Sequence, residues 1–121
     1  MESEPSLDLA VIASLKALNE PGDGRFFKVL TSAFLLDASD RLSEIRHAVD
    51  SGDYKAVERA SHSLKGSSGN MGARKLHGLM NTLCEMAIGT NLVGAYSIIE
   101  RSDGEFRILE VLLRSELDST M

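Results

Sequence analysis

A short segment near the middle of the chain gathers residue types that suit phosphoryl chemistry. His62 is followed by Lys65 three positions later and by Gly66 four positions later. A neutral imidazole is a good nucleophile near neutral pH, and an ammonium one helical turn away can stabilise an incoming phosphoryl group. The spacing therefore predicts a nucleophilic histidine with a cationic neighbour.

His62 falls on the solvated face of a predicted helix. An α-helix turns about 100° per residue, which places Val57, Ala60 and Leu64 near the pole opposite His62. The side of His62 is shared by charged residues and glycines, namely Glu58, Arg59, Lys65, Gly66 and Gly69. A core histidine is therefore disfavoured, and an incidental surface histidine is the remaining alternative to a functional one.

Gly66 is costly where it stands. A glycine inside a helix is less favourable than alanine by about 1 kcal/mol. One turn beyond His62 it leaves the surface beside the imidazole bare, so that another macromolecule can approach closely. This position favours the functional interpretation of His62.

Basic residues concentrate around His62 although the chain is acidic. The 121 residues carry 13 Lys+Arg and 18 Asp+Glu, a net charge of -5. Between Lys55 and His77 five basic side chains oppose Glu58 alone, so a local +4 leaves -9 for the remainder. The overall charge argues against a nucleic-acid binder, whereas the local excess suits an acidic pocket on a protein partner.

Helical periodicity runs through almost the whole sequence, since apolar residues recur three and four positions apart. The expected helical segments are residues 7–18, a segment with apolar residues from Phe27 to Val49, then 53–68, 73–88 and 92–117. The predicted core residues are Leu7, Val11, Leu15, Leu18, Phe27, Leu30, Phe34, Ala38, Leu42, Ile45, Val49, Val57, Ala60, Leu64, Leu76, Leu79, Met80, Leu83, Ala87, Ala95, Ile98, Ile99, Phe106, Leu109, Leu112 and Leu113. Ser6 is the expected cap of the first helix, and Gly104 is expected to weaken or bend the last.

Four long amphipathic helices and one shorter helix predict an all-α fold, an antiparallel up-and-down four-helix bundle with an additional short N-terminal helix. We expect a single domain over residues 1–121, with a flexible segment at 1–5 and the bundle at about 7–117. The single Cys84 cannot form an intrachain disulfide, and no apolar run reaches the roughly 20 residues of a membrane span. The acidic N-terminus does not resemble a signal peptide, which predicts a cytoplasmic protein.

Other chemistries have weaker support in the sequence. His47, His62 and His77 lack the paired spacing of metal ligands. Cys84 lies beside the predicted core, where an inert thiol is usual. A solvated helix face explains the acidic residues of the second segment, Asp37, Asp40 and Glu44. No metal site is predicted.

Residues 62–73, which read HSLKGSSGNMGA, resemble the signature of histidine-containing phosphotransfer (HPt) domains. The histidine, the leucine, the lysine, the glycine, the serine pair and the later Gly-Ala stand at the expected spacing. Outside this signature the similarity is one of helix number, order and length, over about residues 7–117.

The resemblance implies a role for each residue of the segment. His62 would accept a phosphoryl group, through Nε2, from the aspartyl phosphate of a response-regulator receiver domain and pass it to another receiver's aspartate. Lys65 would stabilise the phosphate and Gly66 would give clearance. The surface expected to bind the partner comprises Glu58, Arg59, Gly66 and Gly69. Ser67 and Ser68 would pack locally, and Gly69 and Gly72 would shape the next turn.

The resemblance also implies which cofactors, activities and contacts are not expected of the chain. No cofactor or metal is expected on it, and Mg²⁺ would be held by the partner receiver domain. Autokinase activity, nucleic-acid binding and membrane contact are not expected. The chain is expected to be a monomer, either free-standing or the last domain of a hybrid sensor histidine kinase.

Two other function classes stay open. The bundle could dock a receiver or another enzyme through the His62 face and regulate it without passing phosphate. A free-standing enzyme is less favoured, because one exposed histidine with a lysine lacks the supporting residues of a cleft.

Overall fold

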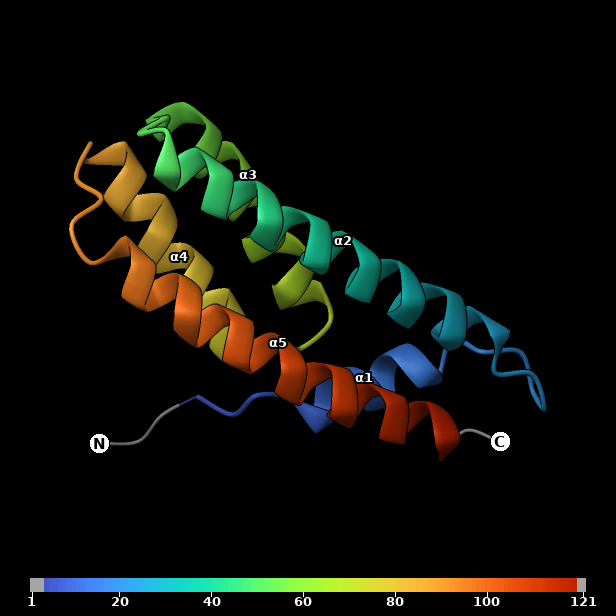
Figure 1. Cartoon of the computed structure of the whole chain (residues 1–121). Helices are drawn as coiled ribbons and strands as arrows, with labels where there is room; N and C mark the ends of the chain where they lie inside the picture. Colours follow the sequence, from blue (N-terminus) through green and yellow to red (C-terminus); the bar gives the residue numbers. More distant parts are fainter. Residues whose placement is uncertain (1–3, 120–121) are drawn as a thin grey trace.

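The computed structural model describes residues 4–119, and these form five α-helices and no strand. The helices are α1 (Leu9–Lys16), α2 (Arg25–Asp50), α3 (Tyr54–Asn70), α4 (Arg74–Ile88) and α5 (Ala95–Asp118). Helices α2 to α5 contact one another in a ring, each antiparallel to the next (Figure 1). The predicted all-α, antiparallel four-helix bundle with a short additional N-terminal helix is confirmed.

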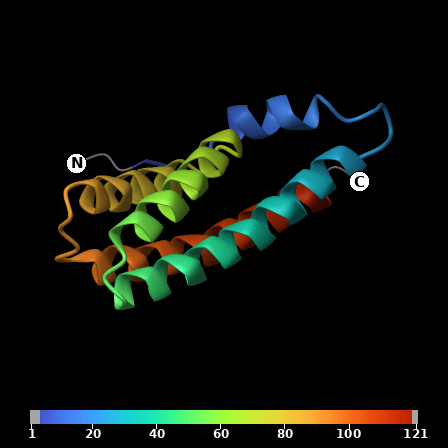
Figure 2. The same ribbon diagram turned by 90° about the horizontal axis from the view of Figure 1, so that it is seen from above.

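Two helices of the bundle are longer than the other two. Helix α2 has 26 residues and α3 has 17, a difference of nine residues or about 13 Å of helix. The ends of α2 and α5 therefore extend past α3 and α4, and α1 lies beside this extension (Figure 2). The ion pair of Lys16 with Glu116, 2.7 Å from Nζ to Oε1, ties α1 to α5.

The core follows the apolar stripes of the sequence in α2, α3 and α4. All the predicted core residues of these helices are buried except Leu30, which is half-buried. Helix α5 agrees less well, because Leu112 is 37% exposed while Ser102 and Glu105 are buried. The helix is continuous from Ala95 to Asp118, so the weak spot expected at Gly104 does not interrupt it.

The prediction for the first helix was wrong in its bounds and in its cap. Asp8, not Ser6, caps α1, because its Oδ1 accepts a hydrogen bond from the backbone N–H of Ala10 at 3.0 Å. The helix ends at Lys16, so Leu18 falls in the following loop and is 64% exposed. Ile12 is buried in its place, at 1% exposure.

The turn between α3 and α4 is where the N-terminal segment docks. Gly72 has a left-handed φ of +73°, and a Cβ at this position would lie 2.9 Å from Cβ of Val11. The backbone N–H of Asp8 donates to the Gly72 carbonyl at 2.7 Å, and that of Lys75 donates to the Pro5 carbonyl at 3.1 Å. Residues 1–3 of the expected flexible segment lie outside the described residues.

Within residues 4–119, no helix combines the length and the apolar character that crossing a membrane requires.

Candidate functional site

His62 lies on α3 with its side chain exposed, as its helical phase predicted. Asp53 starts this helix by accepting a hydrogen bond from the backbone N–H of Ala56 at 3.1 Å. The opposite face of α3 is anchored by Val57 and Leu64, both fully buried. Among residues 4–119 none hydrogen-bonds the imidazole of His62, so both ring nitrogens are available.

Two cationic residues flank His62, three positions before it and three after. Helical side chains lean toward the N-terminus of their helix and cover the preceding turn. By this rule we expect the Lys65 side chain to lean toward the imidazole and that of Arg59 to lean away from it. Of the two cations, Lys65 is the one placed to meet a group bound on His62.

Gly66 leaves the C-terminal side of His62 uncovered. A side chain at this position would lean back over the imidazole four residues earlier. A Cβ built at Gly66 meets nothing within 4 Å, so the packing of the bundle does not require a glycine here. What the glycine provides is open space beside an exposed nucleophile.

His47 provides an internal comparison, because it too is exposed on a helix. The residues three positions before and after it, Glu44 and Asp50, are acidic, whereas those around His62 are basic. An anionic phosphoryl group is attracted to cations and repelled by carboxylates. The surroundings therefore distinguish His62 from His47.

His77, on α4, contacts the site from the neighbouring helix. Its Nδ1 lies 2.9 Å from the carbonyl oxygen of Lys65. A Cβ at Gly69 would lie 3.3 Å from the same Nδ1. Gly69 thus makes room for the His77 ring within α3. Both glycines were expected to shape the turn into α4. The left-handed residue of that turn is Gly72, whose N–H donates to the Gly69 carbonyl at 3.1 Å. Spacing along the chain did not predict this contact, although the glycine at residue 69 inside a helix was a signal for it.

The basic excess around His62 is smaller than the sequence suggested. Arg74 is neutralised, because its Nε lies 2.8 Å from Oε1 of Glu4 and its Nη1 lies 3.3 Å from Oδ2 of Asp8. Four cations of α3 and α4 form no ion pair with a residue in the described range, namely Lys55, Arg59, Lys65 and Lys75. Their charge is therefore available to a partner.

An apolar groove borders the site on the side of α2. It has a volume of about 350 Å³ and runs between α1, α2 and the end of α3. Leu15, Leu30, Phe34 and Met71 are among the residues that line it. Ser67 and Asn70 of α3 form its edge nearest to His62, five and eight residues further along the same helix, or about 7 and 12 Å.

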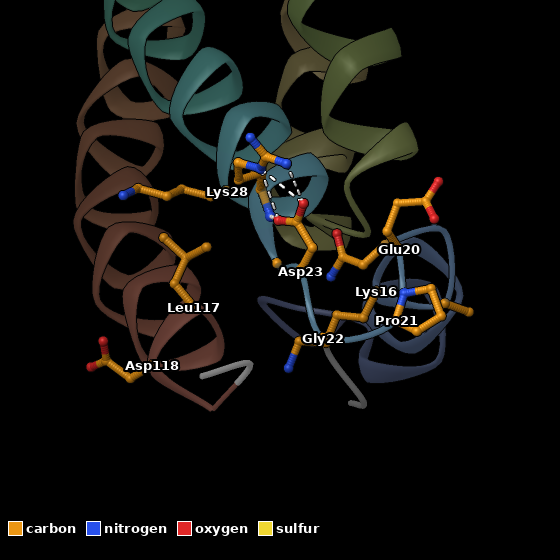
Figure 3. A pocket seen from close by; sticks show the side chains of 12 residues that line it. Lys16, Glu20, Pro21, Gly22, Asp23, Lys28, Leu117 and Asp118 are labelled. Atoms are coloured by element: carbon orange, nitrogen blue, oxygen red, sulfur yellow. Dashed lines mark hydrogen bonds and ion pairs between the residues drawn. The ribbon is translucent and has the colours of Figure 1, made fainter.

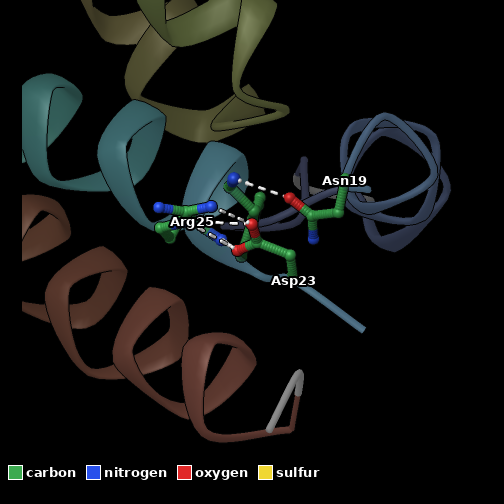
Figure 4. Close-up of polar contacts among 4 residues, drawn as sticks. Asn19, Asp23 and Arg25 are labelled. Atoms are coloured by element: carbon green, nitrogen blue, oxygen red, sulfur yellow. Dashed lines mark hydrogen bonds and ion pairs between the residues drawn. The ribbon is translucent and has the colours of Figure 1, made fainter. Parts of the chain in front are cut away.

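A separate cavity of about 830 Å³ lies far from His62, between the α1–α2 loop and the end of α5 (Figure 3). Two of its charged residues, Arg25 and Asp23, form an ion pair of 2.6 Å with each other. Asn19 Oδ1 accepts from the backbone N–H of Phe27 and Asp23 Oδ1 from that of Arg25, which caps the start of α2 (Figure 4). The N–H groups of Arg25 and Phe27 are therefore already bonded and are not offered to an anion.

The other candidates of the sequence analysis gain no support. Across residues 4–119 no cluster of three or more His, Cys, Asp or Glu residues could hold a metal ion. Cys84 is buried, as predicted. Asp37 and Glu44 both pair with Arg41, at 3.5 and 3.0 Å, so they belong to an ion-pair network on the surface of α2.

Comparison with known proteins places this geometry in a family. The model of the family described as "Hpt domain" matches residues 29–118. The chain is 28% identical over 103 residues to histidine-containing phosphotransfer protein 2 of Arabidopsis thaliana and 27% identical over 105 residues to protein 5. These matches cover 83% and 84% of this chain, but only 66% and 67% of the length of the two relatives.

A solved structure is similar over almost the whole chain. The crystal structure of histidine-containing phosphotransfer protein B (HptB) from Pseudomonas aeruginosa PAO1 superimposes with a TM-score of 0.87 at 37% sequence identity. The match covers 97% of this chain and 98% of that one.

Proposed function

We propose that His62 is the residue that carries the phosphoryl group. The premise is that the chain belongs to the Hpt domain family, whose members are phosphorelay intermediates in two-component signalling. The phosphoryl group would come from the aspartyl phosphate of one receiver domain and leave to the aspartate of another. The partner surface would comprise Glu58, Arg59, Gly66 and Gly69.

One observation carries this proposal. His62 is exposed, and the position that would cover it is a helical glycine around which an added Cβ meets nothing. Packing does not require this glycine, and its place beside an exposed imidazole is what assigns it to clearance for a docking protein. A carrier histidine needs this clearance, because its phosphorus must be reached in line by a carboxylate of another protein.

The transfer step requires little of the chain itself. Nε2 of neutral His62 attacks phosphorus, an N–P bond forms, and the acyl P–O bond breaks to leave the receiver's aspartate as a carboxylate. The proton on Nδ1 remains on the ring or passes to water. Lys65, leaning toward the imidazole, offsets the charge of the phosphoryl oxygens. Mg²⁺ is assigned to the receiver's carboxylates, which are acidic ligands of the kind that this ion prefers.

The surroundings of His62 fit a receiver domain in two ways. The unpaired cations of α3 suit the acidic pocket in which a receiver holds Mg²⁺ and its aspartate. The apolar groove beside Ser67 and Asn70 offers contact area on the α2 side. Neither feature requires a second copy of the chain, so we assign the relay step to the monomer.

Labelling experiments test the proposal. Each receiver domain encoded in the same genome would be loaded with radiolabelled acetyl phosphate and Mg²⁺, mixed with the chain, and the label followed. We expect at least one receiver to transfer an acid-labile, base-stable phosphate to the wild-type chain and none to label His62→Gln. His47→Gln is the matched control for an exposed histidine and should be labelled normally.

Two outcomes would overturn the proposal. Wild-type labelling of His62→Gln would place the phosphate elsewhere. Binding of receivers to the chain with no label from any of them would show a docking module that regulates without transfer.

A further inference from the structure

The contact of His77 with Lys65 has no role in the transfer step as described above. The carbonyl of Lys65 carries no proton, so at 2.9 Å the His77 ring must donate to it from Nδ1–H. This bond fixes the tautomer of a neutral ring and its orientation. His77 is therefore a rigid, half-buried group held against the backbone of the phosphate-facing lysine.

The position of the ring follows from Gly69. A side chain at residue 69 would lean back over Lys65, four positions earlier. Gly69 leaves that place empty, and the His77 ring occupies it, since a Cβ there would lie 3.3 Å from Nδ1 and 3.6 Å from Cε1. An aromatic ring of α4 thereby lies against the backbone of Lys65.

This half of α3 needs support from outside. Residues Lys65 to Asn70 include two glycines and two serines, which are weak helix formers, so the helix around the site is intrinsically less stable than a typical one. A hydrogen bond from α4 to the Lys65 carbonyl opposes fraying at the start of this stretch. A lysine side chain also loses more conformational entropy than most when it is held in place. A neighbouring ring that excludes some of its rotamers reduces the entropy that must be lost.

We propose that His77 is a positioning residue for phosphoryl transfer, which holds the backbone of Lys65 and directs its ammonium toward His62. The inference rests on the proposed function of His62 and adds a residue that acts through Lys65. His77 itself does not touch the phosphoryl group.

Three substitutions of His77 separate its hydrogen bond from its bulk. His77→Leu removes the donor, His77→Asn keeps an amide donor near the place of Nδ1, and His77→Gln moves the donor to the place of Nε2. The probe is phosphoramidate, which transfers its phosphoryl group to an imidazole with loss of ammonia and needs no partner protein. We expect labelling of His62 to slow about fivefold in the Leu and Gln variants, the effect of one lost hydrogen bond, and to recover in the Asn variant.

A double-mutant cycle shows whether His77 acts through Lys65. In a Lys65→Ala background, His77→Leu should cause no further loss of rate. Gly69→Ala serves as a second perturbation, because it displaces the ring without removing it, and it should slow labelling while the Tm stays equal or rises. Thermal unfolding of every variant checks that the bundle is folded.

The positioning role would be overturned if His77→Leu were labelled by phosphoramidate at the wild-type rate. It would also be overturned if His77→Leu slowed labelling as much in the Lys65→Ala background as in the wild-type chain. Failure of the proposed function looks different, since His62→Gln would then still take up the label whatever stands at residue 77.

Discussion

The absence of a Cβ at Gly66 should have a measurable effect on the free energy of unfolding. Gly66 is in the interior of α3, and a Cβ there would meet no atom within 4 Å. A helix accepts alanine more readily than glycine, so the natural residue lowers the stability of the bundle. A site that gives up helix stability for clearance should lose activity when that stability is restored.

Gly66→Ala is therefore expected to raise the free energy of unfolding by up to about 1 kcal/mol. Transfer from a receiver should nevertheless fall at least about tenfold, because displacement of the reacting atoms by 1 Å lowers rates steeply. Denaturant unfolding and the labelling rate measure the two effects on the same variant.

Gly104→Ala is the matched control for this substitution. Gly104 is also helical and a Cβ there also meets nothing within 4 Å, but it lies on α5, across the bundle from α3. It should gain similar stability and keep its transfer rate. Equal rates in the two variants would contradict the clearance role of Gly66.

At the scale of elements, the turn between α3 and α4 is held by the N-terminal segment. Asp8 has three roles there, because it caps α1, donates its N–H to Gly72 and pairs with Arg74. The helix that carries His62 thus ends against a segment more than sixty residues away in sequence. Its position depends on α1 as well as on the bundle.

The titration of Asp8 reports on this arrangement. The hydrogen bond from Ala10, and after it the bond from Arg74, hold the pKa of Asp8 below its ordinary value of 3.8. A lowered pKa means that the carboxylate stabilises the folded state above the unfolded pKa, and that this stabilisation is lost as the pH falls through the folded value.

We expect the side-chain carboxyl resonance of Asp8 to titrate below pH 3.8 by NMR. In Arg74→Gln its pKa should rise but stay below 3.8, because the Ala10 N–H is the larger cause. An Asp8 that titrates at or above 3.8 in the wild-type chain would contradict its role as the cap of α1, and an unchanged pKa in Arg74→Gln would contradict its pairing with the turn.

The elements differ in how far the sequence predicts them. Long apolar stripes determined the core of α2, α3 and α4, since residues such as Phe34 and Leu83 repeat at helical spacing over several turns. The short first helix has only two turns, so one capping side chain, Asp8, shifted its bounds and exchanged Leu18 for Ile12 in the core. An apolar pattern over only two turns is too short to determine where a helix begins and ends, so a single capping residue can decide it.

The site was predictable where it lies on one helix and not where it depends on contacts between elements. Helical phase alone placed His62 outside and Lys65 and Gly66 beside it. The pairing of Arg74 with Glu4 and Asp8, and the bond of His77 to Lys65, join residues distant in sequence. Spacing along the chain contains no information on such contacts until the helices are packed.

At the scale of the whole molecule, charge is segregated. The chain has a net charge of -5, yet the cations of α3 that surround His62 form no ion pair with residues in the range 4–119. Such a distribution orients an acidic partner before contact and raises the rate of association more than the affinity.

Association with a receiver that labels the chain should accordingly depend on salt. We expect the association rate, measured by stopped flow, to fall about tenfold between low and high ionic strength. Arg59→Glu should lower it at low salt, and it should slow labelling by phosphoramidate less than Lys65→Ala does, because a side chain at residue 59 leans away from the imidazole. Arg107 of α5 also forms no ion pair with a residue in the range 4–119, so Arg107→Glu is the control and should lower the association rate less.

The imidazole of His62, bound by none of the described residues, also determines the kind of carrier this chain can be. A catalytic histidine held by a carboxylate is committed to one proton path, whereas nothing in the described residues restricts this ring to one path. If His62 carries the phosphoryl group as proposed, the bundle itself neither traps the N–P bond nor drives it onward. The direction of flow would then be set by the two partner proteins, and we expect transfer to be reversible.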